Sequence, residues 1–231
     1  MESNFQEPNN SLLASWTPSF NACTDWYGVI CFNGRVNTLN ITNSIVIGTL
    51  YAFPFSSLPF LENLDLSMNN FSGTIPPEIG NLTNLVFLNL KINQFSGTIP
   101  QQIGSLAKLQ TLRIFDNHLN GSIPLKIGYL RSLTKLSLAM NSLNGSIPAS
   151  LGNLSNLSVL DLSDNHFSGS IPLEIGYLSE VKENKEEEII ASRQVTNKEG
   201  FDFRTSDFQV PVGVMDLVLP MLQLMIVGFD F

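Results

Sequence analysis

The sequence predicts a repeat solenoid of the α/β type, in which stacked coils contribute parallel strands to a sheet on the concave face. A 24-residue pattern recurs five times without a gap between residues 61 and 180. Each copy contains a short alternation of leucines, which is typical of a strand with one buried face. A pair of cysteines upstream of the repeats indicates a small N-terminal cap.

The five regular coils align on their leucines and are preceded by an irregular unit at Val36–Phe60. No coil can fold alone, because only stacking buries both of its sides. The regular coils are Leu61–Asn84, Leu85–Lys108, Leu109–Ser132, Leu133–Asn156 and Leu157–Glu180.

Within a coil, Leu64 and Leu66 mark the strand, and the next strand begins only 24 residues later, so neighbouring strands run parallel. Ile75-Pro76 predicts an extended segment, because proline restricts its own φ and that of the preceding residue. We expect one glycine of each coil to permit a tight outer turn: Gly80, Gly104, Gly128, Gly152 and Gly176. We expect one asparagine of each coil to bond backbone groups where the coil turns inward: Asn69, Asn93, Asn117, Asn141 and Asn165.

The composition narrows the classes of partner. Hydrophobic residues make up 43% of the 231 residues and charged residues 14%, which is too apolar for a disordered chain. The formal net charge of −8 argues against nucleic acid, whose phosphates are bound through Lys and Arg.

The chain has two cysteines, Cys23 and Cys31. A local pair suits a disulfide or half of a zinc site, but zinc normally takes four ligands and no further Cys or His lies nearby. The pattern therefore favours a disulfide, which also indicates an oxidising compartment.

Asn-x-Ser/Thr sequons support passage through such a compartment, although repeats rich in Asn, Ser and Thr generate sequons by themselves. No basic and apolar signal peptide is visible at the start, so either the native N-terminus lies upstream or the product is not secreted. The sequons are Asn9, Asn40, Asn70, Asn81, Asn120, Asn144, Asn153 and Asn156.

The repeat L-x-x-L-x-L-x-x-N-x-(L/F)-x-G-x-I-P-x-x-(I/L)-G-x-L resembles the plant-specific leucine-rich repeat of receptor-like kinase ectodomains and polygalacturonase-inhibiting proteins. Leu13-Ala14-Ser15-Trp16 and the stretch 23–31, which ends Trp26-Tyr27-Gly28-Val29-Ile30-Cys31, look like the N-terminal cap of that family. The resemblance implies a right-handed superhelix, a cap disulfide and an extracellular or plasma-membrane-associated location. Kinase motifs and a second, C-terminal cysteine pair are absent from this sequence.

The pattern divides the chain into a cap at 1–35, an irregular first repeat at 36–60, five repeats at 61–180 and a non-repeat tail at 181–231. The acidic run 181–188 lacks the leucines of a sixth regular coil and predicts a solvated linker or short helix. Val210–Phe229 is apolar but interrupted by Asp216 and two prolines, so a hydrophobic flap on the last coil, or sequence unrelated to the repeat fold, is favoured over a membrane span.

The sequence contains no Gly-rich phosphate loop, G-x-S-x-G or H-E-x-x-H motif. We call the asparagines at the inward turns of the coils the ladder asparagines, and His118 and His166 each directly follow one of them. Asp161 and Asp164 have no acid–base partner in their motif. We therefore expect a non-catalytic protein without cofactor, metal or catalytic residues.

Variable positions between the leucines point to the concave face and line up from coil to coil. In the middle coils they gather aromatic and basic residues, which are common binding anchors. The predicted ligand-binding residues are Phe87, Asn89, Lys91, Arg113, Phe115, Asp116, Lys135, Ser137 and Asp161.

Three functional hypotheses follow. The resemblance favours a receptor-type ectodomain that binds a peptide, a protein or another leucine-rich-repeat receptor in signalling or defence, with membrane attachment only if the full-length form carries a transmembrane segment. A secreted inhibitor of a cell-wall-degrading enzyme is the second, disfavoured because that family has more repeats and a second capping disulfide. The third is a non-functional truncated receptor.

Limited proteolysis tests the predicted end of the repeats. We expect the first cuts between Val181 and Lys198, because the solvated acidic stretch lacks the leucines that anchor a coil. Mass spectrometry of the fragments would locate the cuts. Protection of this stretch equal to that of the repeats would show that it is an integral cap.

Overall fold

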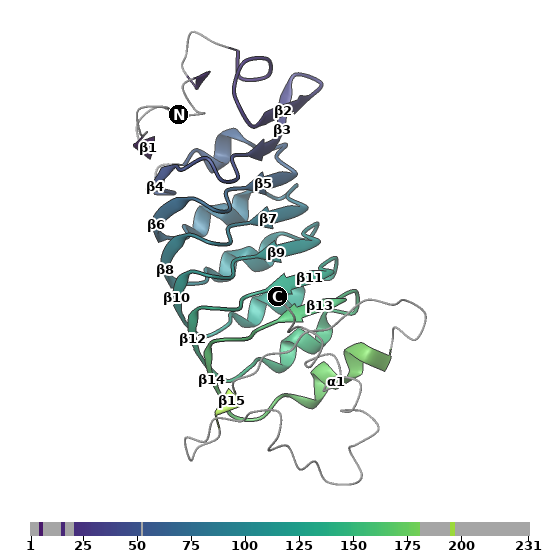
Figure 1. Ribbon diagram of the computed structural model, residues 1–231. Coiled ribbons are helices and arrows are strands. Elements are labelled where there is room, and N and C mark those ends of the chain that lie inside the picture. The colour runs from purple at the N-terminus through teal and green to yellow at the C-terminus, as the bar shows by residue number, and fades with distance from the viewer. Residues whose placement is uncertain (1–4, 7–14, 17–20, 52, 181–194, 197–231) are drawn as a thin grey trace, which may run out of the picture.

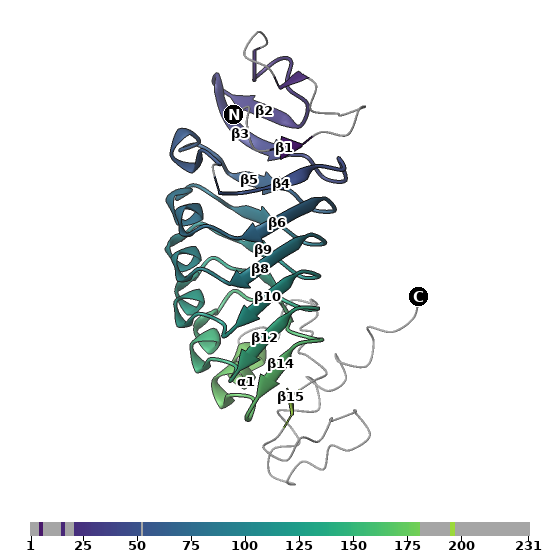
Figure 2. The same cartoon turned by 90° about the vertical axis from the view of Figure 1, so that its left-hand side faces the viewer.

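The computed structural model describes residues 5–6, 15–16, 21–51, 53–180 and 195–196. The repeats stack in sequence order as coils of one solenoid (Figure 1). Each regular coil contributes one strand to each of two sheets and a short helix to a third side (Figure 2). Asn9, the run 181–188 and the apolar stretch Val210–Phe229 lie outside the described residues.

A seven-stranded sheet carries the predicted leucine alternation. Leu64 of its third strand is fully buried, whereas its neighbours Asn63 and Asp65 are half-buried and point to the other face. The strands pair in parallel except for the first two, which form an antiparallel hairpin at the N-terminal edge. They are β2 (Val29–Phe32), β3 (Arg35–Asn40), β5 (Asn63–Asp65), β7 (Phe87–Asn89), β9 (Thr111–Arg113), β11 (Lys135–Ser137) and β13 (Val159–Asp161).

An eight-stranded sheet was not predicted and lies beside the first. Its regular strands begin directly after the ladder asparagines, and each buries one large side chain such as Phe71 or Phe95. The following glycines, Gly73 and Gly97 among them, have a positive φ. The strands are β1 (Phe5–Gln6), β4 (Ile47–Thr49), β6 (Asn70–Thr74), β8 (Gln94–Thr98), β10 (His118–Gly121), β12 (Ser142–Gly145), β14 (His166–Ser168) and β15 (Val195–Thr196).

Short 3-10 helices form the third side of the coils, seen along the left of Figure 2. The proline before each regular helix is extended, with φ −70° and ψ 145° at Pro76, as the Ile-Pro motif predicts. The helices are η2 (Phe55–Ser57), η3 (Pro77–Asn81), η4 (Gln101–Ser105), η5 (Leu125–Tyr129) and η6 (Ala149–Asn153).

The helix glycines act differently from the prediction. A Cβ atom on Gly80 would lie 2.7 Å from the carbonyl oxygen of Gln102 in the next coil. Gly80 is not among the residues with a positive φ, so glycine is needed here because adjacent coils approach closely, not because the backbone turns sharply. The positive-φ glycines of the regular coils lie instead in the strands of the eight-stranded sheet or directly after them.

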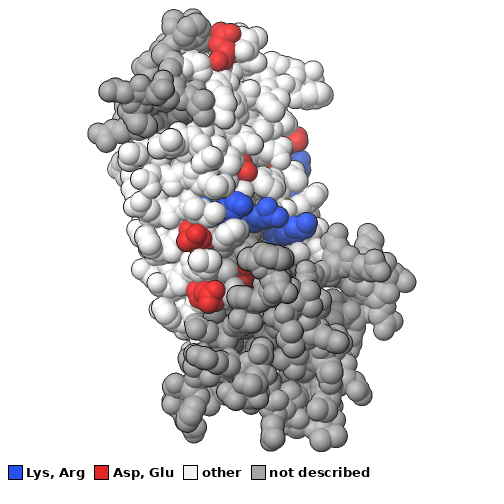
Figure 3. Space-filling view, in the orientation of Figure 1, with Lys and Arg blue, Asp and Glu red and all other residues white. Residues whose placement is uncertain are grey.

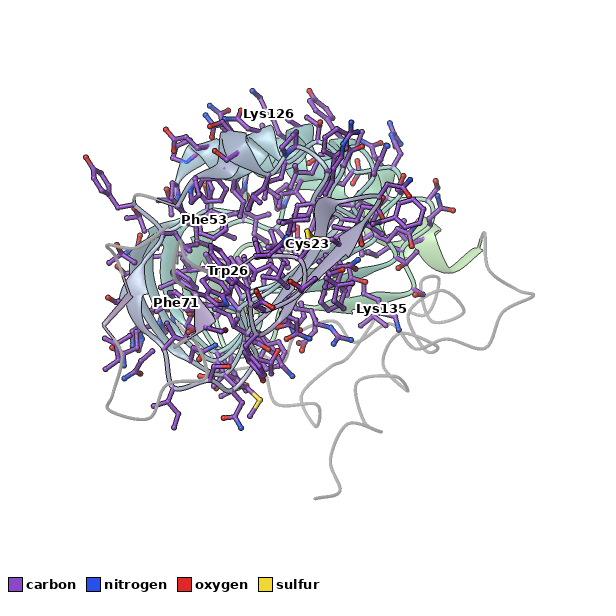
Figure 4. The ribbon with its side chains drawn as sticks, turned by 90° about the horizontal axis from the view of Figure 1, so that it is seen from above. Cys23, Trp26, Phe53, Phe71, Lys126 and Lys135 are labelled. Atoms are coloured by element: carbon purple, nitrogen blue, oxygen red, sulfur yellow. A yellow bond between two sulfur atoms is a disulfide. The ribbon has the colours of Figure 1, made fainter. Side chains whose placement is uncertain are left out.

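The core is a continuous column of aliphatic side chains enclosed by the two sheets and the helices. Phe71 and Phe95 stack in neighbouring coils with ring centroids 6.1 Å apart, and both are fully buried. Figure 4 looks down the solenoid and shows Phe53, Phe71 and Trp26 within the coil outline.

Each ladder asparagine bonds its own coil to the preceding one. Asn117 Nδ2 donates to the carbonyl oxygens of Leu90, Ile114 and Phe115, at 3.1 to 3.2 Å. Its Oδ1 accepts the Phe95 amide at 3.0 Å. Asn93, Asn141 and Asn165 repeat this pattern, and all four are buried. One amide group therefore satisfies backbone groups of its own coil and the preceding one.

The cap contains the predicted disulfide. The sulfur atoms of Cys23 and Cys31 are 2.00 Å apart and their Cα atoms 5.4 Å apart. Trp16 stacks on Trp26 with centroids 5.3 Å apart, and Trp16 Nε1 donates to the Tyr27 carbonyl oxygen at 2.9 Å. The disulfide thus joins the turn at Cys23 to Cys31 in β2, the edge strand of the seven-stranded sheet.

The solenoid continues past its last regular coil. The helix α1 (Leu173–Glu180) takes the place of a 3-10 helix and packs on η6. Val195 then pairs in parallel with Phe167, so the second sheet gains one strand after residue 180. In the part of the chain that the structure describes, no helix has both the length and the apolar character of a membrane span.

The ladder predicts a stability loss in Asn117→Ala. The change leaves buried backbone carbonyls and one amide without their partner, so the free energy of unfolding should fall by about 1–3 kcal/mol. Denaturant titration measures it, with the exposed Asn120→Ala as the matched control. An unfolding midpoint equal to that of the control would contradict this role.

Loss of the disulfide should also lower stability. In Cys31→Ser, the unfolded cap is no longer restricted by a nine-residue loop, which is expected to cost about 2.5 kcal/mol. Thermal unfolding of the secreted protein measures the shift, and the double variant Cys23→Ser/Cys31→Ser should match the single one. Two titratable thiols in the native protein would contradict the bond.

Candidate ligand-binding surface

The outward residues of the seven-stranded sheet form columns across the coils. We call this outward side the strand face. Neighbouring strands lie about 4.8 Å apart, and the register aligns equivalent repeat positions. The first column is Thr38, Asn63, Phe87, Thr111, Lys135 and Val159, and the second is Asn40, Asp65, Asn89, Arg113, Ser137 and Asp161.

Arg113 stands at the centre of the second column with a neutral residue on each side. Asn89 is 3% exposed, and its Nδ2 donates to Asp65 Oδ2 at 3.0 Å. Ser137 is 9% exposed, and its hydroxyl lies 3.4 Å from Asp161 Oδ2. The carboxylates of Asp65 and Asp161 are thus bonded within the column, and each lies two strands from Arg113.

Each of those carboxylates has further partners in its own coil. Asp65 Oδ1 accepts the Ser67 amide and hydroxyl at 3.0 and 2.6 Å. Asp161 Oδ1 accepts the Ser163 amide and hydroxyl at 3.1 and 2.7 Å. Arg113 is half-buried, and no ion pair joins it to another of the described residues.

Lys91 and Phe115 lie just beyond the ends of their strands, in adjacent coils. The Lys91 ammonium is 5.4 Å from the Phe115 ring centroid, within the range of a cation–π contact. This contact holds the lysine stem against the ring, so a charge and an apolar surface are presented together.

Phe87 and Lys135 are in the first column but do not adjoin. Thr111 separates them, because Phe87 and Lys135 both pair with it in register. Two strand spacings place them roughly 10 Å apart. Lys135 projects from the side of the solenoid opposite Lys126 of η5 (Figure 4). The predicted cluster is therefore a line of groups across β7, β9 and β11, not one pocket.

The charges on this face are segregated. Figure 3 shows Lys and Arg side chains in a row across the middle, with Asp and Glu on both sides of it. Asp116 is half-buried and has φ +57°, and it belongs to the turn after β9. Asn89 and Ser137 contribute little accessible surface, and their place is to position the flanking aspartates.

One of the predicted sequons, Asn40, lies on the strand face, a position that the sequence alone did not indicate. Asn40 is the last residue of β3, is exposed, and pairs in register with Asp65. The remaining described sequons lie on the second sheet or at the helices: Asn70, Asn81, Asn120, Asn144, Asn153 and Asn156. The middle of the strand face contains no sequon.

The arrangement has the character of a recognition surface. A shallow hollow of about 750 Å³ lies elsewhere, beside η3 to η5, where Pro77, Pro100, Lys126 and Tyr129 contribute to its lining. Within the described ranges, no three His, Cys, Asp or Glu side chains gather as metal ligands. The strand face instead offers aromatic, cationic and hydrogen-bonding groups on a rigid sheet.

Stacked 24-residue coils, a buried asparagine ladder and a parallel strand face define the leucine-rich-repeat class of solenoid. The chain belongs to this family, because residues 36–186 match the leucine-rich repeat region. Plant leucine-rich-repeat receptor kinases are among its curated relatives and its structural neighbours, and a plant ice-binding protein is a further neighbour, with a TM-score of 0.68 at 28% identity over 80% of this chain and 58% of that chain.

Three relatives illustrate the likeness. The chain is 51% identical over 83 residues to MDIS1-interacting receptor like kinase 2 of Arabidopsis thaliana, which covers 34% of this chain and 8% of that protein. The PEPR1–AtPEP1 structure superimposes with a TM-score of 0.74 at 34% identity, over 84% of this chain and 27% of the receptor. Arabidopsis HAESA with the peptide hormone IDA and co-receptor SERK1 gives 0.71 at 32% identity, over 81% and 31%.

The chain thus spans under a tenth of the receptor kinase and less than a third of the two receptor chains. The resemblance covers part of the repeat-bearing ectodomain of these receptors. Sequence analysis therefore identified the family correctly from the repeat and the cap.

Proposed function

We propose that this chain is a non-catalytic recognition module that binds an extracellular peptide or another leucine-rich-repeat ectodomain. The observation that carries the proposal is the half-buried Arg113, which has an uncharged neighbour on each side and no acidic partner in the described part of the chain. The related HAESA structure, which contains a peptide hormone and a co-receptor, supports the same class of ligand.

The position of Arg113 favours an anionic ligand group. A guanidinium held on a rigid strand can bond both oxygens of one carboxylate. Asp65 and Asp161 lie two strands away on either side and are bonded to Ser67 and Ser163. These bonds keep the two carboxylates turned toward their own coils. An acidic side chain or a terminal carboxylate of a ligand would neutralise the charge of Arg113.

Aromatic groups would supply the apolar part of the contact. Phe115 lies beside Lys91, and Phe87 lies two strands from Lys135 along the first column. Aromatic and arginine side chains dominate the energy of most interfaces. We propose Phe87, Lys91, Arg113, Phe115 and Lys135 as direct contacts, with Asp116 at their border and Asn89, Ser137 and Asp161 as residues that position them.

The same proposal assigns no catalysis to the chain and places it outside the cell or at the plasma membrane. The leucine-rich-repeat region is the part shared with the receptor kinases, and the kinase motifs are absent from this sequence. We propose the same division of the chain as before: a cap at 1–35, an irregular coil at 36–60, five repeats at 61–180 and a tail at 181–231.

Binding kinetics test the proposed surface. The full secreted chain would be screened by biolayer interferometry against a panel of plant peptide hormones and receptor ectodomains. Arg113→Glu should slow association and weaken its salt dependence, because complementary charges steer the encounter between partners. Phe115→Ala should accelerate dissociation, because apolar anchors act mainly on release.

The matched control is Lys126→Glu, which makes the same charge reversal on η5, at the opposite side of the coil (Figure 4). It should leave both rates unchanged. Far-ultraviolet circular dichroism would establish that each variant is folded. A partner whose kinetics respond to Lys126→Glu but not to the strand-face changes would move the site to the helix side.

A further inference from the structure

The last residues of the regular 3-10 helices form a row on the helix side of the solenoid. They are Asn81 of η3, Ser105 of η4, Tyr129 of η5 and Asn153 of η6, at the same repeat position in four consecutive coils. All four are exposed. The helices stack on one another along this side (Figure 2), so each side chain of the row lies beside those of the adjacent coils.

Tyr129 is the aromatic member of this row. Its side chain is 63% exposed, and no hydrogen bond or ring contact joins it to another of the described residues. Leu125 of the same helix is 70% exposed, and both residues line the hollow beside η3 to η5. The other regular 3-10 helices end in a polar residue, so the coil does not need an aromatic ring at this position. Aromatic side chains contribute most where their faces are covered, and the polypeptide does not cover this one.

Asn153, the neighbour of Tyr129 in the row, begins a sequon that ends at Ser155. Its carbonyl oxygen accepts a hydrogen bond from Arg131 Nη1. The Arg131 amide in turn donates to the Tyr129 carbonyl oxygen at 2.8 Å, so Arg131 fixes the two residues relative to each other. No hydrogen bond joins the side-chain amide of Asn153 to another residue in the part of the chain that the structure describes. Attachment of a group at Asn153 Nδ2 therefore breaks no contact of the coil.

The sequon that follows three residues later is different. Asn156 Nδ2, the atom that would carry a sugar, donates to the Arg131 carbonyl oxygen at 2.8 Å. The hydroxyl of this sequon, on Ser158, is buried and donates to the Thr134 carbonyl oxygen at 2.9 Å. A sugar on Asn156 would lie against the backbone of the preceding coil. Of the two overlapping sequons, the structure favours Asn153.

We infer that Asn153 carries an N-linked glycan whose first N-acetylglucosamine packs on the ring of Tyr129 in the adjacent coil. The C–H groups of a sugar ring form an apolar face, and the face of an aromatic ring is its complement. The inference rests on the extracellular location in the proposed function, because N-glycans are added to proteins that are secreted or exposed on the cell surface.

The modification joins Asn153 Nδ2 to the anomeric carbon of the oligosaccharide. The donor is a lipid-linked oligosaccharide diphosphate. Its bond between the anomeric carbon and phosphate breaks, the lipid diphosphate leaves, and the amide nitrogen gives up one proton. The hydroxyl of Ser155 completes the acceptor sequence.

A glycan held on Tyr129 lies over η5 and covers the apolar rim of the hollow. This side of the solenoid is opposite the one from which Lys135 projects, as the labels of Lys126 and Lys135 show in Figure 4. The middle of the strand face contains no sequon. The contact therefore stabilises the helix side and leaves the strand face open to a partner.

Thermal unfolding of the full chain secreted from plant cells tests the contact. In the glycosylated protein, Tyr129→Ala should lower the unfolding temperature by roughly 2–4 °C. In the Asn153→Gln background the same change should have no effect, because the ring then has no partner. Such a double-mutant cycle separates the contact from the effect of each residue on the fold. Ser155→Ala, which removes the glycan but keeps Asn153, should behave like Asn153→Gln.

The matched control is Asn81→Gln. Asn81 occupies the same repeat position and begins a sequon, but its neighbour in the next coil is Ser105 and not an aromatic residue. Tyr129→Ala should destabilise the Asn81→Gln background as much as it destabilises the parent chain. Glycopeptide mass spectrometry measures the occupancy of each sequon, and we expect Asn153 to be occupied more fully than Asn156.

Three results would overturn the inference: an unoccupied Asn153 in the secreted chain, higher occupancy at Asn156, or an effect of Tyr129→Ala that is the same with and without the glycan. None of them affects the binding test of the proposed function, whose contact residues include neither Asn153 nor Tyr129. Conversely, a partner that ignores the strand-face variants would remove the proposed binding surface and leave the glycan contact standing.

Discussion

The amide of the ladder asparagine is the interaction on which the rest of this structure depends. Every coil turns from one sheet to the other within a few residues, and the turn buries backbone groups that no strand or helix can pair. Asn117 satisfies four of them at once, in its own coil and the one before. A buried amide or carbonyl without a partner costs about 1–3 kcal/mol, so the turn exists only because this side chain is present.

The ladder also explains the geometry of the strand face. It fixes the distance and register between coils, so equivalent repeat positions become straight columns of side chains. Arg113, Asn89 and Ser137 are far apart in sequence yet adjacent on the sheet. The same turn imposes a positive φ on the residue before the asparagine, whatever its type. Binding surface and backbone strain therefore have one origin, which is the stacking of identical turns.

The arrangement separates stability from recognition. Leucines, ladder asparagines and helix glycines are repeated because each meets the same neighbours in every coil. Positions between them are free to vary, and this chain places Phe, Lys and Arg there in its middle coils. A substitution on the strand face can thus change the surface of the sheet without disturbing the core, so one scaffold can present many different surfaces.

The sequence by itself determined the solenoid, the parallel strands, the disulfide of the cap and the family, because a strict 24-residue period leaves a single way to bury the leucines. It also pointed to the strands for most of the candidate binding residues, whereas Lys91, Phe115 and Asp116 lie just beyond the ends of β7 and β9. It did not reveal the second sheet, whose short Phe-Ser-Gly-Thr segments carry no clear alternation and become strands only when they stack. Nor did it reveal that Gly80 is required for close approach, since the atom that a Cβ would meet belongs to another coil. The burial of Asn89 and Ser137, and the absence of an ion pair at Arg113 among the described residues, were likewise decided by tertiary structure. These properties depend on contacts between residues about 24 positions apart. The sequence of one coil does not specify which atoms of the next coil lie against it.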